Sequence, residues 1–144
     1  MKLPIDFFLQ GIKERKVYYF SSTKLNTSAI HYFICVLKST DDTIILVCCT
    51  SDRDNKRKER IEKLGLHRTL VWIKPDERNG LVKDTFVDCN SFFEYSIDDF
   101  KTMYEDDKLE YKGEISETHY EQIINGLLDS PEIPIEIKEL LLNK

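Results

Sequence analysis

Two almost continuous apolar runs lie close together in the first half of the chain, at residues 31–38 and 43–50. The residues between them, 39–42, are Ser, Thr and two Asp, which are typical of a turn. Two strands joined by a short polar turn form an antiparallel hairpin. Because nearly every residue of both runs is apolar, we expect this hairpin to be buried on both faces and to form the centre of the fold.

Shorter segments rich in β-branched and aromatic residues flank this hairpin. They predict strands at residues 17–20, 69–73 and 84–89, and residues 92–95 extend or follow the last of these. Residues 75–80 contain Pro, Asp, Asn and Gly, and we interpret them as a turn.

Helical patterns gather toward the C-terminus. Ser96, followed by Ile and two Asp, predicts the N-cap of a helix that ends near residue 106. A second helix begins at Ser116 or Glu117, and a third spans residues 135–142. The second would carry one apolar stripe formed by Tyr120, Ile123, Ile124 and Leu127.

Two further segments have less regular patterns. Residues 3–12 form a short helix or a loop that packs Phe7 and Phe8 onto the core. The stretch with the highest density of charge predicts a short helix from Asp54 to about residue 64, ended by Gly65.

The order of these elements indicates the fold class. Strands come first, helices come late and the two do not alternate, which argues against a parallel α/β sheet. We expect an α+β fold in which a small antiparallel sheet or barrel covers about residues 16–115 and two or three helices follow at about residues 116–142. A chain of 144 residues fits one domain, so residues 1–144 are assigned to a single domain.

Charge is divided unevenly along the chain, although the net formal charge is only −5. Residues 1–80 contain 15 Lys and Arg against 10 Asp and Glu, whereas residues 81–144 contain 6 against 16. This division indicates a basic functional surface and an acidic solvated one, or simply C-terminal helices with acidic outer faces.

The sequence shows no signal for a membrane or for secretion. No apolar stretch approaches the ~18 residues that a membrane helix needs, and Pro4 and Asp6 stand where a signal peptide places its apolar run. The four cysteines form no C-x-x-C pair, and three of them lie in apolar, strand-like runs. We therefore expect buried, reduced thiols in a cytoplasmic protein.

Several classes of site are absent from the sequence. The five glycines form no phosphate-binding loop, and there is no G-x-S-x-G motif. His31, His67 and His119 are too far apart in the sequence to suggest a zinc site. We expect no metal and no nucleotide cofactor.

Polar residues at one end of the hairpin are the candidates for catalysis. His31 opens the first strand, and Thr50 and Ser51 close the second, so antiparallel pairing makes them neighbours. Arg53 follows directly. A histidine beside a hydroxyl and a cation has the groups needed to act on a phosphodiester, with the histidine moving the proton and arginine holding the phosphate. RNA supplies its own nucleophile, the 2′-OH, so this chemistry needs no metal.

The basic residues near this corner are candidates for RNA binding. We assign this role to Lys24, Lys56, Arg57 and Arg60. The alternative is that the basic run is the solvated face of a helix and that His31 is a structural residue at the start of a strand.

The order of these segments resembles the MazF/PemK/Kid family of toxin endoribonucleases. Residues 31–37 (HYFICVL) stand at the family's R-P-initiated strand, residues 47–51 (VCCTS) at its Thr-ended strand and residues 85–91 (TFVDCNS) at its Asp-containing segment. Residues 112–115 (KGEI) lead into the late helix, so the resemblance covers roughly residues 16–130. It implies an SH3-like barrel, cleavage of single-stranded RNA, a homodimer and inhibition by a cognate antitoxin protein.

The chain departs from the family at the catalytic arginine, because His31 and Tyr32 replace the R-P pair. By resemblance, Thr50 helps to position the scissile phosphate. Either His31 replaces the arginine as a charged or proton-transferring group, with Arg53 supplying the missing cation, or cleavage is lost. In the second case the chain is an RNA- or protein-binding barrel of the same fold without catalytic activity.

Overall fold

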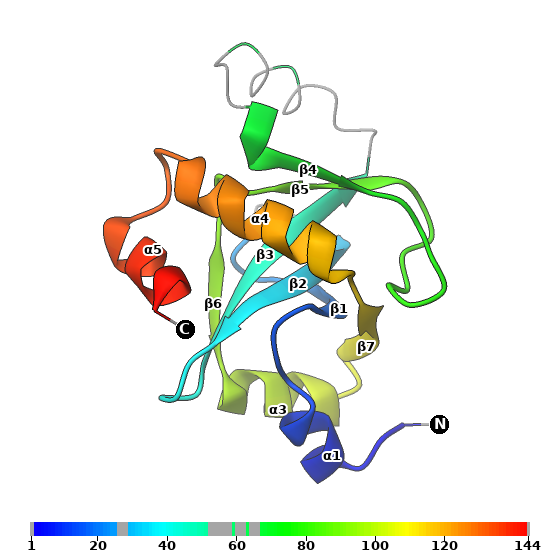
Figure 1. Cartoon of the computed structure of the whole chain (residues 1–144). Helices are drawn as coiled ribbons and strands as arrows, with labels where there is room; N and C mark the ends of the chain where they lie inside the picture. The colour runs from blue at the N-terminus through cyan, green and yellow to red at the C-terminus, as the bar shows by residue number, and fades with distance from the viewer. Residues whose placement is uncertain (1, 26–28, 52–58, 60–62, 64–66, 144) are drawn as a thin grey trace.

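The computed structural model describes residues 2–25, 29–51, 59, 63 and 67–143. Its strands are β1 Lys16–Ser21, β2 Ile30–Lys38, β3 Thr43–Ser51, β4 Leu70–Ile73, β5 Thr85–Asp88, β6 Phe93–Ser96 and β7 Leu109–Glu114. Its helices are α1 Ile5–Gln10, α3 Ile97–Glu105, α4 Glu117–Asp129 and α5 Ile135–Leu142, together with a 3₁₀ turn, η1, at His67–Thr69. Figure 1 shows their arrangement.

The strands form one antiparallel, seven-stranded sheet in the order β4-β5-β3-β2-β1-β7, with β6 paired to β3. Strand β3 changes partner along its length. Residues 43–46 pair with β6, and residues 49–51 pair with β5. Within the described part of the chain the sheet is not closed, since β4 and β7 stand at its two edges. The predicted α+β class with antiparallel strands and late helices is confirmed.

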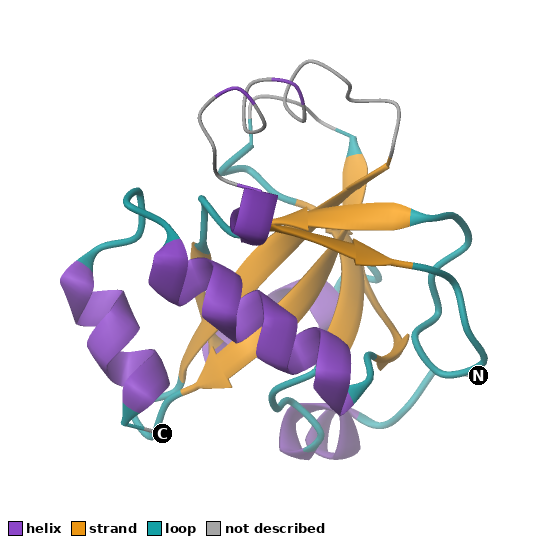
Figure 2. Ribbon diagram, turned by 45° about the horizontal axis from the view of Figure 1, so that its top comes forward, coloured by secondary structure: helices purple, strands orange, loops and turns teal. Residues whose placement is uncertain are grey.

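The central hairpin is confirmed and is buried on both faces. Ile34 and Val36 of β2 point into one apolar cluster, whereas Phe33 and Cys35 point into another. This follows from strand geometry, because successive side chains point to opposite faces. Helices α4 and α5 cover the first cluster, and α1 and α3 cover the second (Figures 1 and 2).

Two helix starts predicted from sequence are confirmed in detail. The Ser96 side chain accepts a hydrogen bond from the Asp99 amide, and the Asp99 carboxylate accepts one from the Ser96 amide, which forms a capping box. The Ser116 side chain accepts from the His119 amide and caps α4. Both caps stabilise helices that cover the sheet.

The structure corrects two details of the sequence interpretation and decides between two alternatives in a third. Phe8 is buried, but Phe7 on the same short helix is 67% exposed and does not pack onto the core. Residues 93–96 form a separate strand against β3, so of the two predicted alternatives they follow β5 rather than extend it. Strand β7 was not anticipated. The helix predicted at residues 54–64 includes positions that lie outside the described residues.

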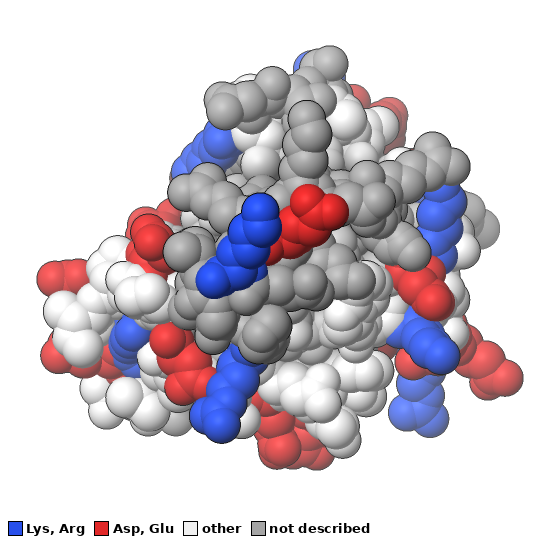
Figure 3. Space-filling view, turned by 90° about the horizontal axis from the view of Figure 1, so that it is seen from above, with Lys and Arg blue, Asp and Glu red and all other residues white. Residues whose placement is uncertain are grey.

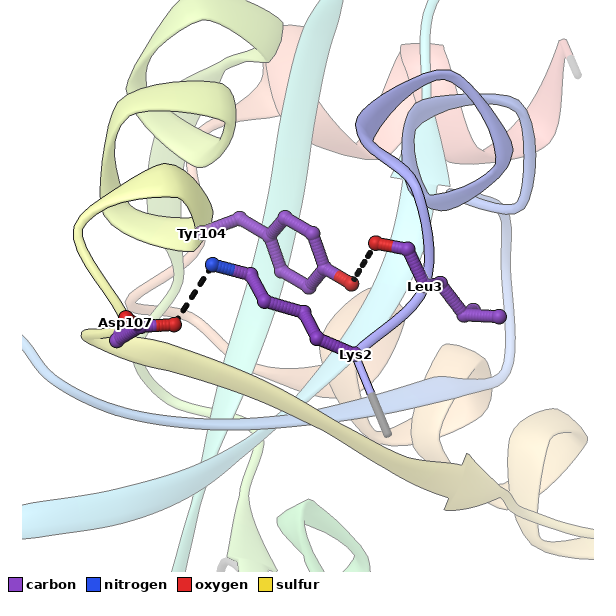
Figure 4. Close-up of polar contacts among 4 residues, drawn as sticks. All are labelled: Lys2, Leu3, Tyr104 and Asp107. Carbon is purple, nitrogen blue, oxygen red and sulfur yellow. Dashed lines mark hydrogen bonds and ion pairs between the residues drawn. The ribbon is translucent and has the colours of Figure 1, made fainter.

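The segment before α1 is attached to α3 by polar contacts (Figure 4). The Lys2 ammonium lies 2.7 Å from the Asp107 carboxylate and 4.6 Å from the centre of the Tyr104 ring. The Tyr104 hydroxyl donates to the Leu3 carbonyl at 2.6 Å. These contacts hold α1 over the aromatic cluster on its face of the sheet.

Two further expectations concern the cysteines and the membrane. All four cysteines are thiols, and Cys35, Cys49 and Cys89 are buried, as predicted. Burial raises the pKa of the Cys49 and Cys89 thiols, which keeps them protonated. Among the described residues, no helix has the length and apolar character needed to cross a lipid bilayer.

Candidate functional site

A pocket of about 270 Å³ opens where the ends of β2 and β3 move apart. We call it the β2–β3 pocket. Its lining residues are Tyr19, Ile30, His31, Tyr32, Cys49, Thr50, Leu81, Val82, Lys83 and Thr85.

The change of partner by β3 explains why the pocket forms here. The β2–β3 ladder runs from Phe33 opposite Cys48 to Lys38 opposite Ile44. Beyond Phe33, β2 continues against β1, whereas β3 beyond Cys48 continues against β5. The two strands of the hairpin therefore separate at this end, and their side chains line the space between them.

His31 lies in the lining of this pocket and is partly exposed. Its Nδ1 lies 3.1 Å from the Ala29 carbonyl oxygen. Because a carbonyl oxygen can only accept, this contact places a proton on Nδ1 and makes Nε2 the acceptor nitrogen of the neutral ring. An imidazole held in this way can take a proton from a substrate hydroxyl.

Thr50 lines the same pocket, as the hairpin predicted. Its backbone carbonyl accepts a hydrogen bond of 2.7 Å from the hydroxyl of Thr85, which is only 5% exposed. This bond ties the end of β3 to the start of β5 and fixes the backbone of Thr50. Sequence reasoning did not find Thr85, because the pairing of β3 with β5 is visible only in three dimensions.

The outer wall of the pocket comes from the β4–β5 loop, residues 74–84. The side chain of Asn79 is completely buried and donates to the Lys74 carbonyl at 2.8 Å, while its oxygen accepts from the Leu81 amide at 3.0 Å. The loop also docks against β7, where the Glu114 amide donates to the Arg78 carbonyl at 2.8 Å. Hydrogen bonds within the loop and to β7 therefore hold the loop in place as part of the pocket wall.

The same loop supplies a cation that sequence reasoning missed. Lys83 is exposed and lines the pocket beside Val82, which is 74% exposed. An ammonium group at the rim of an open pocket suits an anionic substrate. The signal in the sequence was weak, because a lone lysine after a turn is an ordinary surface residue.

An aromatic pair forms the inner side of the pocket. Tyr19 and Tyr32 are opposite each other on β1 and β2, and their ring centres lie 4.6 Å apart at an interplanar angle of 40°. The Lys112 ammonium lies 5.3 Å from the centre of the Tyr19 ring and 2.6 Å from a Glu110 carboxylate oxygen. The hydrogen bond with Glu110 raises the pKa of Lys112, which keeps this cation charged.

The other predicted site residues fall in different places. The backbone of Ser51 pairs with Thr85 at the end of β3. Lys24 lies with its ammonium 4.6 Å from the centre of the Tyr95 ring and donates to the Glu94 carbonyl, outside the lining of the pocket. Arg53, Lys56, Arg57 and Arg60 lie outside the described residues, so their predicted roles stay predictions.

The predicted basic surface includes Arg53, Lys56, Arg57 and Arg60, which lie outside the described residues, so it stays a prediction. Figure 3 shows the molecule from above, where Lys and Arg side chains of the described residues are interspersed with Asp and Glu. The described residues contain no group of three or more His, Cys, Asp or Glu side chains arranged to hold a metal ion.

The chain was compared with known proteins. No protein-family model and no curated protein matches it. Among 24 matching chains of solved structures is an endoribonuclease in complex with its cognate antitoxin from a mycobacterial species. The TM-score is 0.54 at 14% sequence identity, and the match covers 86% of this chain and 98% of that chain. The two chains share a fold.

The structural similarity to this endoribonuclease concerns the architecture of the chain. Because the match extends over nearly the whole of the other chain, the arrangement of antiparallel sheet and helices described above is shared with that endoribonuclease. At this sequence identity the likeness concerns the fold alone.

Proposed function

We propose that this chain is an endoribonuclease of the toxin type that cleaves single-stranded RNA in the β2–β3 pocket without a metal. One observation carries the proposal: an imidazole, a hydroxyl-bearing residue and an ammonium group, from His31, Thr50 and Lys83, line one open pocket. The shared fold with an antitoxin-bound endoribonuclease supports it.

The reaction needs only these groups and the RNA. The Nε2 of His31 takes the proton of the 2′-OH, and the 2′-oxygen attacks the adjacent phosphorus. The bond from phosphorus to the 5′-oxygen breaks, and this oxygen takes a proton from the imidazolium or from water. The products are a 2′,3′-cyclic phosphate and a 5′-hydroxyl end.

The developing negative charge on the phosphoryl oxygens needs compensation. The Lys83 ammonium supplies charge at the rim, and the Thr50 hydroxyl supplies a hydrogen bond. Arg53 is proposed as a second cation. In this proposal His31 transfers the proton, and Lys83 and Arg53 supply positive charge. In the MazF/PemK/Kid family that the sequence resembles, an arginine at the start of the strand supplies this charge.

The proposal extends to partners. The matched endoribonuclease is bound to its cognate antitoxin, and we propose that a cognate antitoxin also inhibits this chain. Lys24, Lys56, Arg57 and Arg60 are proposed to contact the RNA backbone, and the active form is proposed to be a homodimer.

The test is an RNA-cleavage assay in EDTA with purified wild-type protein and two variants. We expect His31→Ala to lower the initial rate by about 10²- to 10⁴-fold, as for loss of a general acid–base. Thr50→Val keeps the shape of the side chain but removes the hydroxyl, and we expect a loss of about 10²-fold or more. The 5′ ends of the products should carry a hydroxyl group.

His119→Ala is the matched control, because His119 lies near the start of α4 and outside the pocket lining. It should cleave RNA at the wild-type rate. Thermal melts of all variants exclude unfolding as the cause. If wild-type protein binds RNA in EDTA but leaves it intact, the chain is an RNA-binding protein without this activity and the proposal is wrong.

A further inference from the structure

The β2–β3 pocket contains more than the groups that the cleavage step uses. Tyr19 and Tyr32 both line it and are partly exposed, and neither takes part in the proton transfer proposed above. They stand on adjacent strands in direct register, so the sheet itself fixes the separation of their rings. The two rings are tilted by 40° to each other and form an apolar surface at the side of an open, otherwise polar pocket.

Such a surface has a specific use in the recognition of single-stranded nucleic acid. Unpaired bases stack on aromatic side chains, and each stacked base contributes about 1–3 kcal/mol by alanine substitution. Burial is the largest effect on the Tyr32 hydroxyl and raises its pKa, so the ring is a neutral phenol at physiological pH. A neutral ring carries no charge that would repel phosphate.

Two lysines lie near the tyrosine pair. Lys112 lies beside Tyr19 at 5.3 Å from the ring centre, and Lys83 lines the same pocket from the β4–β5 loop. Because Lys112 is paired with Glu110, Lys83 is the cation available for a phosphate next to a base on the rings. The pocket volume of about 270 Å³ suits one base rather than several.

We infer that Tyr19 and Tyr32 form a stacking platform for one unpaired nucleobase of the RNA, next to the phosphate that His31 and Thr50 contact. The inference rests on the proposed RNA substrate but not on cleavage. The platform recognises the flat face of a base, so it binds any base, and it positions the strand for the reaction.

The test measures binding of 2′-O-methyl RNA, which lacks the nucleophile and stays intact on wild-type protein. A 2-aminopurine base in the oligonucleotide reports stacking, because its fluorescence is quenched when it stacks. We expect Tyr32→Leu and Tyr19→Leu to raise Kd by about 5- to 150-fold, the equivalent of the stacking energy of one base. Quenching by the protein should disappear in both variants.

Two variants keep the comparison specific. Tyr32→Phe retains the ring and should bind and quench like the wild type. Tyr111→Leu removes another exposed tyrosine, on β7 and outside the lining of this pocket, and should also bind normally. An oligonucleotide with one abasic position, moved along the strand, should lose affinity at a single position. Thermal melts verify that the leucine variants are folded.

The outcomes separate this inference from the proposed function. If the protein cleaves unmodified RNA but Tyr32→Leu binds and quenches like the wild type, the platform is wrong and the nuclease stands. The platform is also wrong if the wild-type protein binds every abasic RNA as tightly as the RNA without an abasic position. If unmodified RNA stays intact and the leucine variants lose affinity and quenching, the platform stands and the nuclease fails.

Discussion

At the scale of single residues, Asn90 connects three separate parts of the chain. Its amide donates to the Thr69 hydroxyl at 2.8 Å and to the Asp88 carboxylate at 2.9 Å, and its oxygen accepts from the Ser130 hydroxyl at 2.6 Å. Thr69, Asp88 and Ser130 are all less than 5% exposed. Buried polar groups are costly without partners, so this one amide stabilises the junction of η1, β5 and the end of α4.

We expect Asn90→Ala to lower the free energy of unfolding by about 2–3 kcal/mol, because it leaves buried hydroxyls without this partner. Urea denaturation measures it as a lower midpoint with an unchanged slope. Asn125→Ala, on the exposed side of α4, is the matched control and should stay within about 0.5 kcal/mol. A similarly small effect at Asn90 would show that the network is dispensable.

Sequence reasoning located His31 and Thr50 correctly at one end of the hairpin, because local antiparallel pairing is sufficient to place them together. It could not find Lys83 or Thr85. These residues reach the pocket only through the β4–β5 loop and the pairing of β5 with β3, which joins positions 35 residues apart. The aromatic pair was missed because strand 17–20 was not assigned a partner.

At the scale of elements, α1 is a six-residue helix that depends on contacts with α3. Phe8 stacks on Tyr104 with ring centres 3.9 Å apart and nearly parallel planes. The Tyr104 hydroxyl then bonds to Leu3 ahead of the helix. A helix this short is unstable alone, so packing has to supply its stability.

We expect Tyr104→Phe to lower the free energy of unfolding by about 1 kcal/mol, because it keeps the stacked ring but removes one hydrogen bond. Hydrogen exchange of the amides of α1 should become faster while that of β2 and β3 stays the same. Tyr111→Phe, which alters an exposed phenol, is the control. Unchanged exchange in α1 would mean that the contact with Leu3 does not hold the segment.

The strongly patterned elements could be predicted from the sequence: the all-apolar hairpin, and the helices that begin at Ser96 and Ser116. Strand β7 could not be. Its sequence, LEYKGE, contains three charges and a glycine, which give no strand pattern. Its structure depends on pairing with β1 almost a hundred residues earlier in the chain.

At the scale of the whole molecule, the pocket wall depends on a backbone contact far from the catalytic groups. A Cβ atom on Gly113 of β7 would overlap the Arg78 carbonyl oxygen, and one on Gly80 would overlap the Lys112 carbonyl. Gly80 also has a φ of +71°, which favours glycine. These two glycines let the β4–β5 loop lie directly on β7.

We expect Gly113→Ala to displace this loop and to lower both stability and RNA cleavage. The overlap should cost about 1–3 kcal/mol of unfolding free energy, and kcat/KM should fall because Lys83 moves with the loop. Gly11→Ala is the control, since a Cβ there would make only ordinary contacts. If the Gly113→Ala protein is destabilised but cleaves RNA at the wild-type rate, the position of the loop does not affect cleavage.

The overall class was predictable because most strands precede most helices in the sequence, although α1 comes before β1 and β7 follows α3. The order of the strands was not, since it depends on β3 pairing first with β6 and then with β5 along its length. The sequence of the nine-residue strand β3 does not indicate where along the strand this change of partner occurs.

The docking of the loop on β7 also limits self-association. An exposed strand edge tends to pair with other chains, and proteins protect such edges with charges or with a covering loop. At β7 the Arg78 carbonyl already accepts the Glu114 amide, and Glu110 and Lys112 place charges along the remainder. Two copies of this chain therefore cannot join through a continuous sheet at the Glu114 end of β7.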